Sequence, residues 1–152
     1  MPQSFGTTSY FPIHAYRMTN AAGETRNVRW QIVPEGGDVS RTPEDAAASA
    51  PDALFDEIRE RVARGPVAFR LRVQVAEPGD PTDDSTIAWP ESRRVVDLGR
   101  ILVTAGVPDS AEAEKPIGFL PGKAVPGLGP SDDPFFAARA AVYAVAFGKR
   151  NP

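Results

Sequence analysis

Two side chains that can do chemistry together lie four residues apart in an otherwise apolar, alanine-rich segment, residues 134–148. They are Arg139, the only charge in the segment, and Tyr143, its only phenol. The composition predicts a helix, and residues four apart share one face of a helix. A guanidinium that donates a hydrogen bond to a phenol oxygen favours the phenolate form, which can ligate ferric iron. The spacing therefore makes Tyr143 a candidate iron ligand with an arginine partner.

A structural role is the alternative for the same two residues. A long Arg side chain on a core helix can run along apolar surface and place its charge in water, and a buried Tyr can simply fill space. The ends of the predicted helix follow ordinary rules under either interpretation. Asp132 or Asp133 caps its start, Pro134 occupies the first turn and Gly148 closes it. Spacing alone favours the structural role, so the context of the helix has to decide.

The composition describes one globular domain, or part of one. The chain has 152 residues, a net charge of −3 and 41% hydrophobic residues. No basic cluster interleaved with aromatic residues favours nucleic acid, and no apolar run reaches the length of a membrane span. The first residues do not resemble a signal peptide, so we expect the cytoplasm by default, and the periplasm if an upstream segment carries a signal. Without cysteine and with His14 alone, thiolate and multi-histidine metal sites are excluded.

The elements that must position the pair are strands and one further helix. Strands are predicted at Tyr10–Thr19, Asn27–Val33, Val67–Val75 and Arg94–Thr104, with a bulge at Gly99-Arg100 in the last one. An amphipathic helix is predicted at Asp52–Arg64. We expect an α+β fold in which the four strands form one curved antiparallel sheet. The sheet stays open, because closing a filled barrel usually takes about eight strands.

The remaining segments are predicted to be loops and linkers that connect these elements. Residues 35–50 are a loop with one short helical turn, and residues 105–115 are a polar linker. Residues 117–130 are irregular and rich in Pro and Gly. The acidic loop 77–90 lacks the spacing of an EF-hand, which leaves calcium binding as the weaker alternative to a turn and capping role for its aspartates.

A run of residues leads into the last helix and continues along it, in this order: Phe119, Pro121, Pro126, Gly127, Pro130, Ser131, Asp133, Arg139 and Tyr143. Without gaps, this run resembles the proximal haem segment of the haem catalase superfamily. The first hairpin, residues 4–34, also resembles that superfamily, with a Ser-Phe opening and an aromatic strand that ends in Thr-Asn. The residues after Tyr143, A-V-A-F-G-K-R, depart from large catalases and point to the smaller catalase-related peroxidases.

The resemblance implies a role for each matching residue. Tyr143 is expected to be the axial ligand of the iron of haem b, with Arg139 as its hydrogen-bonding partner. Asp133 is expected to hold the Arg139 guanidinium, and His14 to reach the same polar cluster without touching iron. A half-buried His with a backbone partner is the alternative for His14. Three apolar residues are expected to line the proximal face of the haem: Phe119, Phe135 and Val142.

The resemblance also implies what the chain does. It covers nearly the entire chain, and residues 1–152 correspond to the C-terminal, proximal half of the haem domain, with half of its eight-stranded barrel. The other half supplies the distal His and Asn. We therefore expect a haem-dependent peroxidase acting on hydrogen peroxide or an organic peroxide, in an antioxidant role. The alternative is a non-catalytic remnant or subunit that binds haem weakly or not at all and needs a separate distal half.

An open half-barrel is expected to leave an apolar concave face exposed, built from residues such as Val28, Trp30, Phe69 and Leu71. Exposed strand edges and apolar surfaces favour pairing with another chain. The expected partner is a complementary N-terminal half or a second copy of the chain.

Overall fold

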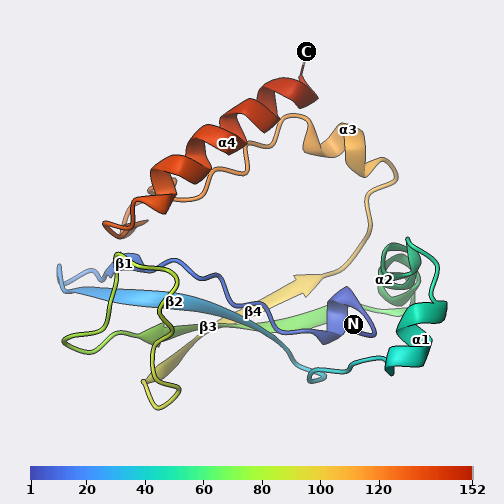
Figure 1. Ribbon diagram of the computed structural model, residues 1–152, viewed down its shortest axis with the longest axis horizontal. Helices are drawn as coiled ribbons and strands as arrows, with labels where there is room; N and C mark the ends of the chain where they lie inside the picture. Colours follow the sequence, from blue (N-terminus) through green and yellow to red (C-terminus); the bar gives the residue numbers. More distant parts are fainter. Residues whose placement is uncertain (152) are drawn as a thin grey trace. The chain divides into compact units, whose positions relative to one another are not determined.

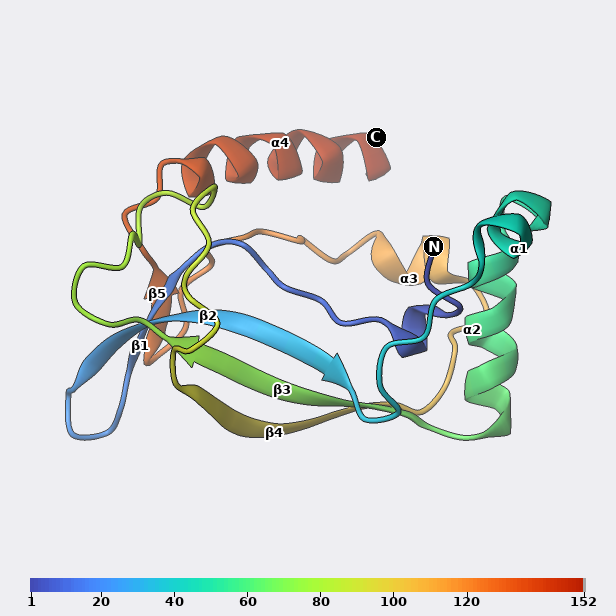
Figure 2. The ribbon, with the colours of Figure 1, turned by 60° about the horizontal axis from the view of Figure 1, so that its bottom comes forward.

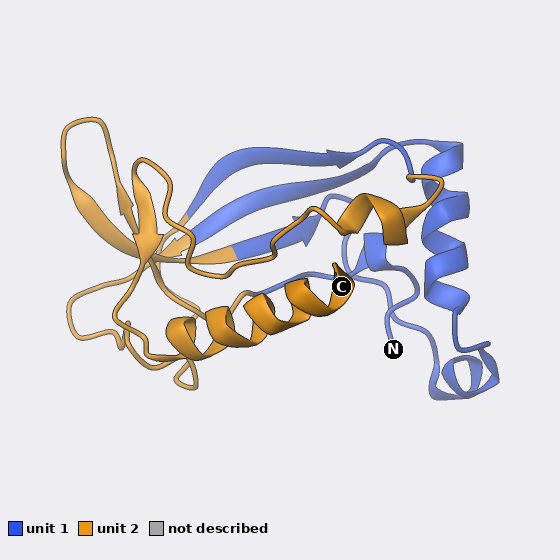
Figure 3. Ribbon diagram, turned by 90° about the horizontal axis from the view of Figure 1, so that it is seen from above, with its two compact units in different colours: residues 1–11, 31–73, 96–106 blue, residues 12–30, 74–95, 107–152 orange. Residues whose placement is uncertain are grey.

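The computed structural model describes residues 1–151 and contains ten helical and strand elements (Figure 1). The chain divides into two compact units, coloured separately in Figure 3. The first comprises residues 1–11, 31–73 and 96–106, and the second residues 12–30, 74–95 and 107 onward. The elements in chain order are η1 (Phe5–Thr7), β1 (Tyr16–Thr19), β2 (Thr25–Pro34), α1 (Pro43–Ala48), α2 (Ala53–Arg64), β3 (Val67–Val75), β4 (Val95–Val103), α3 (Ser110–Glu114), β5 (Leu128–Pro130) and α4 (Phe135–Arg150).

The strands form one open sheet in the order β4-β3-β2-β1-β5, and β1 pairs antiparallel with both β2 and β5. The predicted α+β fold with an open antiparallel sheet is therefore confirmed, but the sheet has five strands rather than four. The fifth strand, β5, is only three residues long and pairs Met18 with Leu128 and Tyr16 with Pro130. Gly127 delivers the chain to it with φ of 79° and accepts a hydrogen bond from the backbone N–H of Thr19.

The first predicted strand is shorter than expected. It was expected from Tyr10 to Thr19, whereas β1 begins at Tyr16, and Tyr10 makes only an isolated bridge with Ile32. Pro12 explains part of the difference, because proline has no N–H to donate to a strand ladder. His14 and Ala15 therefore lie just before the regular strand, although both are buried.

In the first unit, α2 and β3 build the hydrophobic core. Val62, Val67 and Phe69 are buried together. The predicted apolar stripe of α2 accounts for Val62, and the predicted alternation of β3 accounts for Val67 and Phe69. Gly99 in β4 adopts φ of 139° where the sequence predicts a bulge, and Gly65 follows the last residue of α2 as expected. Partly buried residues that pack against this core are Ile32, Ile58 and Ile101.

The second unit contains α3, β1, β5 and α4. The helix α4 begins at Phe135, where Asp133 accepts a hydrogen bond from the Phe135 N–H. The prediction that Gly148 closes this helix is wrong, because α4 continues to Arg150. The short helix α3 lies in a segment that was expected to be a plain linker, and Asp109 caps it by accepting the N–H of Glu112. Among residues 1–151, no helix has the length and hydropathy to span a membrane.

An extended segment, residues 115–122, runs along α4 from its C-terminal end towards its start (Figures 1 and 2). At one end, the Asn151 amide donates to the carbonyl oxygen of Lys115 at 2.9 Å, and Arg150 Nη2 donates to that of Ile117 at 2.8 Å. At the other end, Gly122 lies directly against the ring of Phe136. The Pro- and Gly-rich region is irregular, as predicted, up to β5, and it contacts α4 near both ends of the helix although most of its residues are exposed.

The expected exposed concave face is not present as described. Val28 is 2% exposed and Phe69 is 7% exposed, so the chain itself covers both side chains. Trp30 and Leu71 are half-buried. The exposed apolar surface of the second unit instead includes residues of α4 and of the segment that follows α3: Phe135, Val142, Val145, Phe147, Ile117, Phe119 and Leu120.

Candidate functional site

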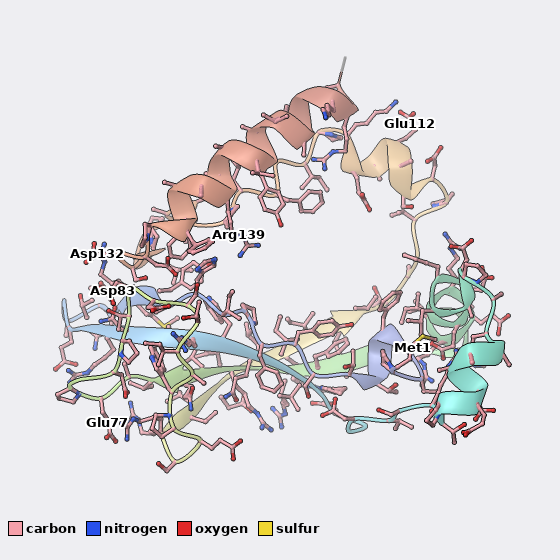
Figure 4. The ribbon with its side chains drawn as sticks, in the orientation of Figure 1. Met1, Glu77, Asp83, Glu112, Asp132 and Arg139 are labelled. Carbon is pink, nitrogen blue, oxygen red and sulfur yellow. The ribbon has the colours of Figure 1, made fainter. Side chains whose placement is uncertain are left out.

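The helix α4 brings Arg139 and Tyr143 together. Arg139 Nη2 donates a hydrogen bond to Tyr143 Oη at 3.3 Å, and the guanidinium carbon lies 5.6 Å from the centroid of the tyrosine ring. Both side chains are half-buried. Arg139 projects from the side of α4 that faces β1 (Figure 4). The spacing of four residues therefore produces the contact expected from helix geometry, at a length close to the upper limit of a hydrogen bond.

His14 and Asp133 form a second, fully buried pair. His14 Nδ1 and Asp133 Oδ2 are 2.7 Å apart, and the two side chains are 3% and 1% exposed. An ionised carboxylate can only accept hydrogen bonds, so Nδ1 carries the proton. The alternative in which His14 is half-buried with a backbone partner is therefore incorrect. The His14 ring also packs against Phe136, with the ring centroids 4.5 Å apart.

The surroundings of Asp133 favour its ionised form. Burial by itself raises the pKa of this carboxyl, but the hydrogen bonds from His14 and from the Phe135 N–H outweigh burial and lower the pKa. Because the Phe135 N–H belongs to the first turn of α4, the carboxylate of Asp133 also fixes where the helix begins.

The two pairs are joined through α4 rather than through direct bonds. No hydrogen bond or ion pair among residues 1–151 links His14 or Asp133 to Arg139 or Tyr143. The expected contact between Asp133 and the Arg139 guanidinium is thus absent from the structure. Asp133 instead holds the helix start, and Arg139 and Tyr143 follow one and two turns later.

Aromatic side chains that sequence reasoning missed fill the space beside the pairs. The Tyr16 ring lies 5.2 Å from that of Phe136 and 6.2 Å from that of Trp30, both in edge-to-face geometry. Burial raises the pKa of Tyr16, while a hydrogen bond with the Gly122 backbone and the charge of Arg139 oppose that rise. Tyr16 therefore belongs to the environment of Arg139. In the sequence, the feature that could have pointed to Tyr16 is its position two residues after His14, which places both on one face of a strand.

The three apolar candidates do not form one cluster. Phe135 and Val142 follow the spacing i, i+7, so they share a stripe of α4 with Arg139. Both are exposed, Val142 to 67%. Phe119 lies towards the other end of the helix, where its ring meets the guanidinium of Arg150 at 5.2 Å. The structure thus places one exposed phenylalanine towards each end of the helix that carries Tyr143.

The loop 77–90 approaches the start of α4 (Figures 1 and 2). Its aspartates have the predicted turn and capping role: Asp84 accepts from the N–H and hydroxyl of Thr86, and Asp80 accepts from the N–H of Glu77 and twice from Arg93. Figure 4 shows Asp83, from this loop, near Asp132 at the end of α4 where the helix begins.

Comparison with known proteins identifies the family of this chain. The family model described as "Catalase" matches residues 1–151. A catalase-related peroxidase of Synechococcus elongatus is 36% identical over 150 residues, which cover 99% of this chain and 44% of that protein. A catalase-related peroxidase of Mycolicibacterium paratuberculosis is 36% identical over 151 residues, covering 99% of this chain and 48% of that protein. This chain therefore spans less than half the length of these relatives.

Solved structures show the same fold. A fungal catalase superposes with a TM-score of 0.86 at 23% identity, covering 99% of this chain and 32% of the catalase chain. Catalase A from Saccharomyces cerevisiae superposes with a TM-score of 0.86 at 23% identity, covering 99% of this chain and 33% of that chain. With a family model that matches nearly every residue and relatives of 36% identity along the whole length, the chain belongs to the catalase family.

Proposed function

We propose that residues 1–152 are the C-terminal, proximal half of a catalase-related peroxidase and that they hold haem b, with Tyr143 as the axial ligand of its iron. The observation that carries the proposal is the hydrogen bond from Arg139 Nη2 to Tyr143 Oη, in a chain that belongs to the catalase family. A phenol oxygen supported by a guanidinium is the ligand chemistry that ferric iron favours.

The surroundings of Tyr143 fit a large, flat, mostly apolar group. Phe135 and Val142 are exposed on the helix that carries the phenol, on the same stripe as Arg139, whereas Phe119 lies beside Arg150 at the other end of that helix and is not part of this surface. An apolar group placed over Phe135 and Val142 would remove this surface from water, at roughly 25 cal/mol per Å² of apolar area. The phenol oxygen and its guanidinium partner supply the polar contact that such a site needs to fix the orientation of a ligand.

Other residues of the chain would then position Tyr143 for its role as iron ligand. Arg139 holds the Tyr143 oxygen by a charge-assisted hydrogen bond, and Asp133 with His14 fixes the start of the helix on which both residues lie. Tyr16 and Phe136 pack beside this arrangement and exclude water. When bound, the haem iron supplies the redox chemistry with peroxide. The proposed substrates are hydrogen peroxide or an organic peroxide.

Haemin titration tests the proposal. Haemin is added to the purified chain, and the absorption spectrum is followed for a phenolate-ligated ferric signature. Tyr143→Phe is expected to abolish that signature. Tyr10→Phe is the matched control, because Tyr10 also donates a hydrogen bond, to the carbonyl oxygen of Phe5, but lies in the other unit. An unchanged spectrum in Tyr143→Phe would exclude Tyr143 as the ligand.

A non-catalytic role is the second candidate, and one observation favours it. The chain contains a single histidine, and its imidazole is buried against Asp133. No second imidazole in this chain can move a proton on the peroxide, which is a common role for His in catalysis. The chain would then be a subunit or remnant that depends on a separate distal half. Peroxide turnover by the haem-loaded chain, with and without that half, distinguishes the two candidates.

A further inference from the structure

Arg29, on β2, has surroundings unusual for a charged residue. It is buried, yet no carboxylate binds its guanidinium directly. Its Nη1 donates to the carbonyl oxygen of Ile87 at 2.7 Å and its Nη2 to that of Asp84 at 3.2 Å. The guanidinium carbon also lies 4.4 Å from the centroid of the Trp89 ring. All three contacts are with the loop 77–90. A buried charge is costly unless such contacts compensate for lost hydration.

The same loop reaches the buried pair at the start of α4. The Ser85 hydroxyl is one of the groups that lower the pKa of Asp133, and Ser85 lies between the residues that Arg29 holds, Asp84 and Ile87. Burial lowers the pKa of Arg29, whereas the negative charge of Asp133 is the largest influence that opposes this shift. The loop that Arg29 holds therefore lies beside the start of α4 (Figures 1 and 2).

The loop depends on Arg29 for much of its attachment. Trp89 is buried, and its indole N–H donates to the carbonyl oxygen of Pro81 at 2.8 Å, so the two ends of the loop are tied to each other. Arg29 ties this closed loop to the sheet through two carbonyl oxygens and the face of the indole. A planar guanidinium can make both hydrogen bonds and the stacking contact at once, which an ammonium cannot do.

We propose that Arg29 is a positioning residue: by fixing residues 84–89 it holds the loop 77–90 against the start of α4, where Asp133 bonds His14 and the Phe135 N–H. The helix in turn carries Arg139 and Tyr143. The step to the haem ligand rests on the proposed function, whereas the steps from Arg29 to His14 do not.

His14 allows this to be tested without haem. It is the only histidine, so its imidazole nuclear magnetic resonance signals are unambiguous. In the wild-type chain, the Nδ1–H is expected to exchange slowly with solvent, because it is buried and bonded to Asp133. In Arg29→Met, we expect the Nδ1–H of His14 and the indole N–H of Trp89 both to exchange at least about tenfold faster, because the loop opens locally.

Two further variants separate the geometry of Arg29 from its charge and from general stability. Arg29→Lys keeps the positive charge but lacks the planar guanidinium. The Nδ1–H of His14 should therefore exchange almost as fast in Arg29→Lys as in Arg29→Met. Full restoration by lysine would show that charge alone matters and would overturn the proposal. Arg26→Met, an exposed arginine on the same strand, is the control and should leave both signals unchanged.

A milder change keeps the proposal testable if Arg29→Met does not fold. Ser85→Ala removes only the hydroxyl, and it is expected to shift the His14 signals while Trp89 keeps its protection. If His14 is unaffected by Ser85→Ala and by the arginine variants, the proposed path from Arg29 to the start of α4 does not exist. Haemin binding, measured separately on wild type, reports on the proposed function alone, so the two ideas fail independently.

Discussion

At the scale of single residues, the proposed role of Tyr143 as a haem ligand depends on its hydrogen bond from Arg139. If Arg139 supports Tyr143 as proposed, Arg139→Ala should weaken haemin binding roughly tenfold or more, because hydrogen bonds to charged groups contribute about 1.5–3 kcal/mol. The absorption spectrum should also move away from phenolate ligation. Arg139→Lys should restore binding only in part, because lysine offers a point donor without the planar fork.

The control for this pair of variants is an arginine of similar chemistry elsewhere. Arg59 on α2 forms an exposed ion pair with Asp56, so Arg59→Ala should leave haemin affinity unchanged. If Arg139→Ala binds haemin with the affinity and spectrum of the wild type, Tyr143 is a tyrosine of the helix and not a ligand.

Asp133 gives a prediction that depends on pH. Its folded pKa lies below the ordinary value of about 3.9, so its contribution to stability is complete above that value and is lost as pH falls through the folded pKa. Asp133→Asn should therefore lower the free energy of unfolding by about 3 kcal/mol at neutral pH, as expected when a buried pair loses one charge. The deficit should shrink below about pH 4, where the carboxyl of the unfolded wild-type chain begins to take up a proton, and should disappear once the folded carboxylate is protonated as well.

The adjacent Asp132 is the matched control for urea unfolding across this pH range. Its side chain is exposed and pairs with Arg17 at 3.1 Å, so Asp132→Asn should change stability by less than about 1 kcal/mol at every pH. A deficit in Asp133→Asn that persists undiminished at pH 2.5 would show that its cost comes from packing rather than from the ionised carboxylate.

At the scale of elements, the packing of residues 115–122 against α4 depends on one glycine. A Cβ on Gly122 would lie 2.8 Å from Cδ1 of Phe136, and φ at Gly122 is 77°. Gly122→Ala should therefore destabilise through both backbone strain and collision with the ring. Gly37→Ala is a close control, since φ is 80° there and no atom lies within 4 Å of the added Cβ.

The difference between these two glycine variants isolates the contact with Phe136. Strain at positive φ costs each variant about 1–2 kcal/mol, and overpacking should add about 1–3 kcal/mol for Gly122→Ala alone. Thermal unfolding of the two variants side by side measures this difference. Equal losses would mean that Phe136 moves aside freely and that the segment is held only at its other end.

Elements with a strong local pattern were predictable from sequence, and so were contacts within one element. The alternation of β3 gave its bounds, Val67 and Val75, and the spacing of Arg139 and Tyr143 gave their contact. Such features depend only on the period of a strand or helix. The spacing and order of residues before the last helix also supported the family, which the comparisons then confirmed.

Features that depend on partners far along the chain were not predictable in this way. The strand β5 exists because β1 offers it a free edge, not because Leu-Gly-Pro favours a strand. Burial of Arg29 depends on Trp89 and on two loop carbonyl oxygens some sixty residues away. The expected bond between Asp133 and Arg139 is absent for the same reason, because Asp133 instead accepts hydrogen bonds from His14, far along the chain, and from the start of α4.

At the scale of the whole molecule, the chain matches relatives more than twice its length, and part of its surface is apolar and exposed. One part of this surface is on α4 and the segment before it, whereas Val28 and Phe69 are covered by the chain itself. Apart from Arg139, α4 carries no charge until its last two residues, which is unusual for a helix with exposed turns. We therefore expect a partner surface on α4.

This expectation predicts concentration-dependent self-association of the isolated chain, because exposed apolar patches associate when their natural cover is missing. Val145, 60% exposed, is a suitable probe on α4. Val145→Glu should shift sedimentation towards monomer, while Val107→Glu, at 59% exposure but outside α4, should not. Adding a complementary N-terminal half should also suppress self-association of the wild type. If the wild type without haem sediments as a single monomer and unfolds cooperatively at every concentration, α4 needs no partner, and the exposed residues are free to receive haem alone.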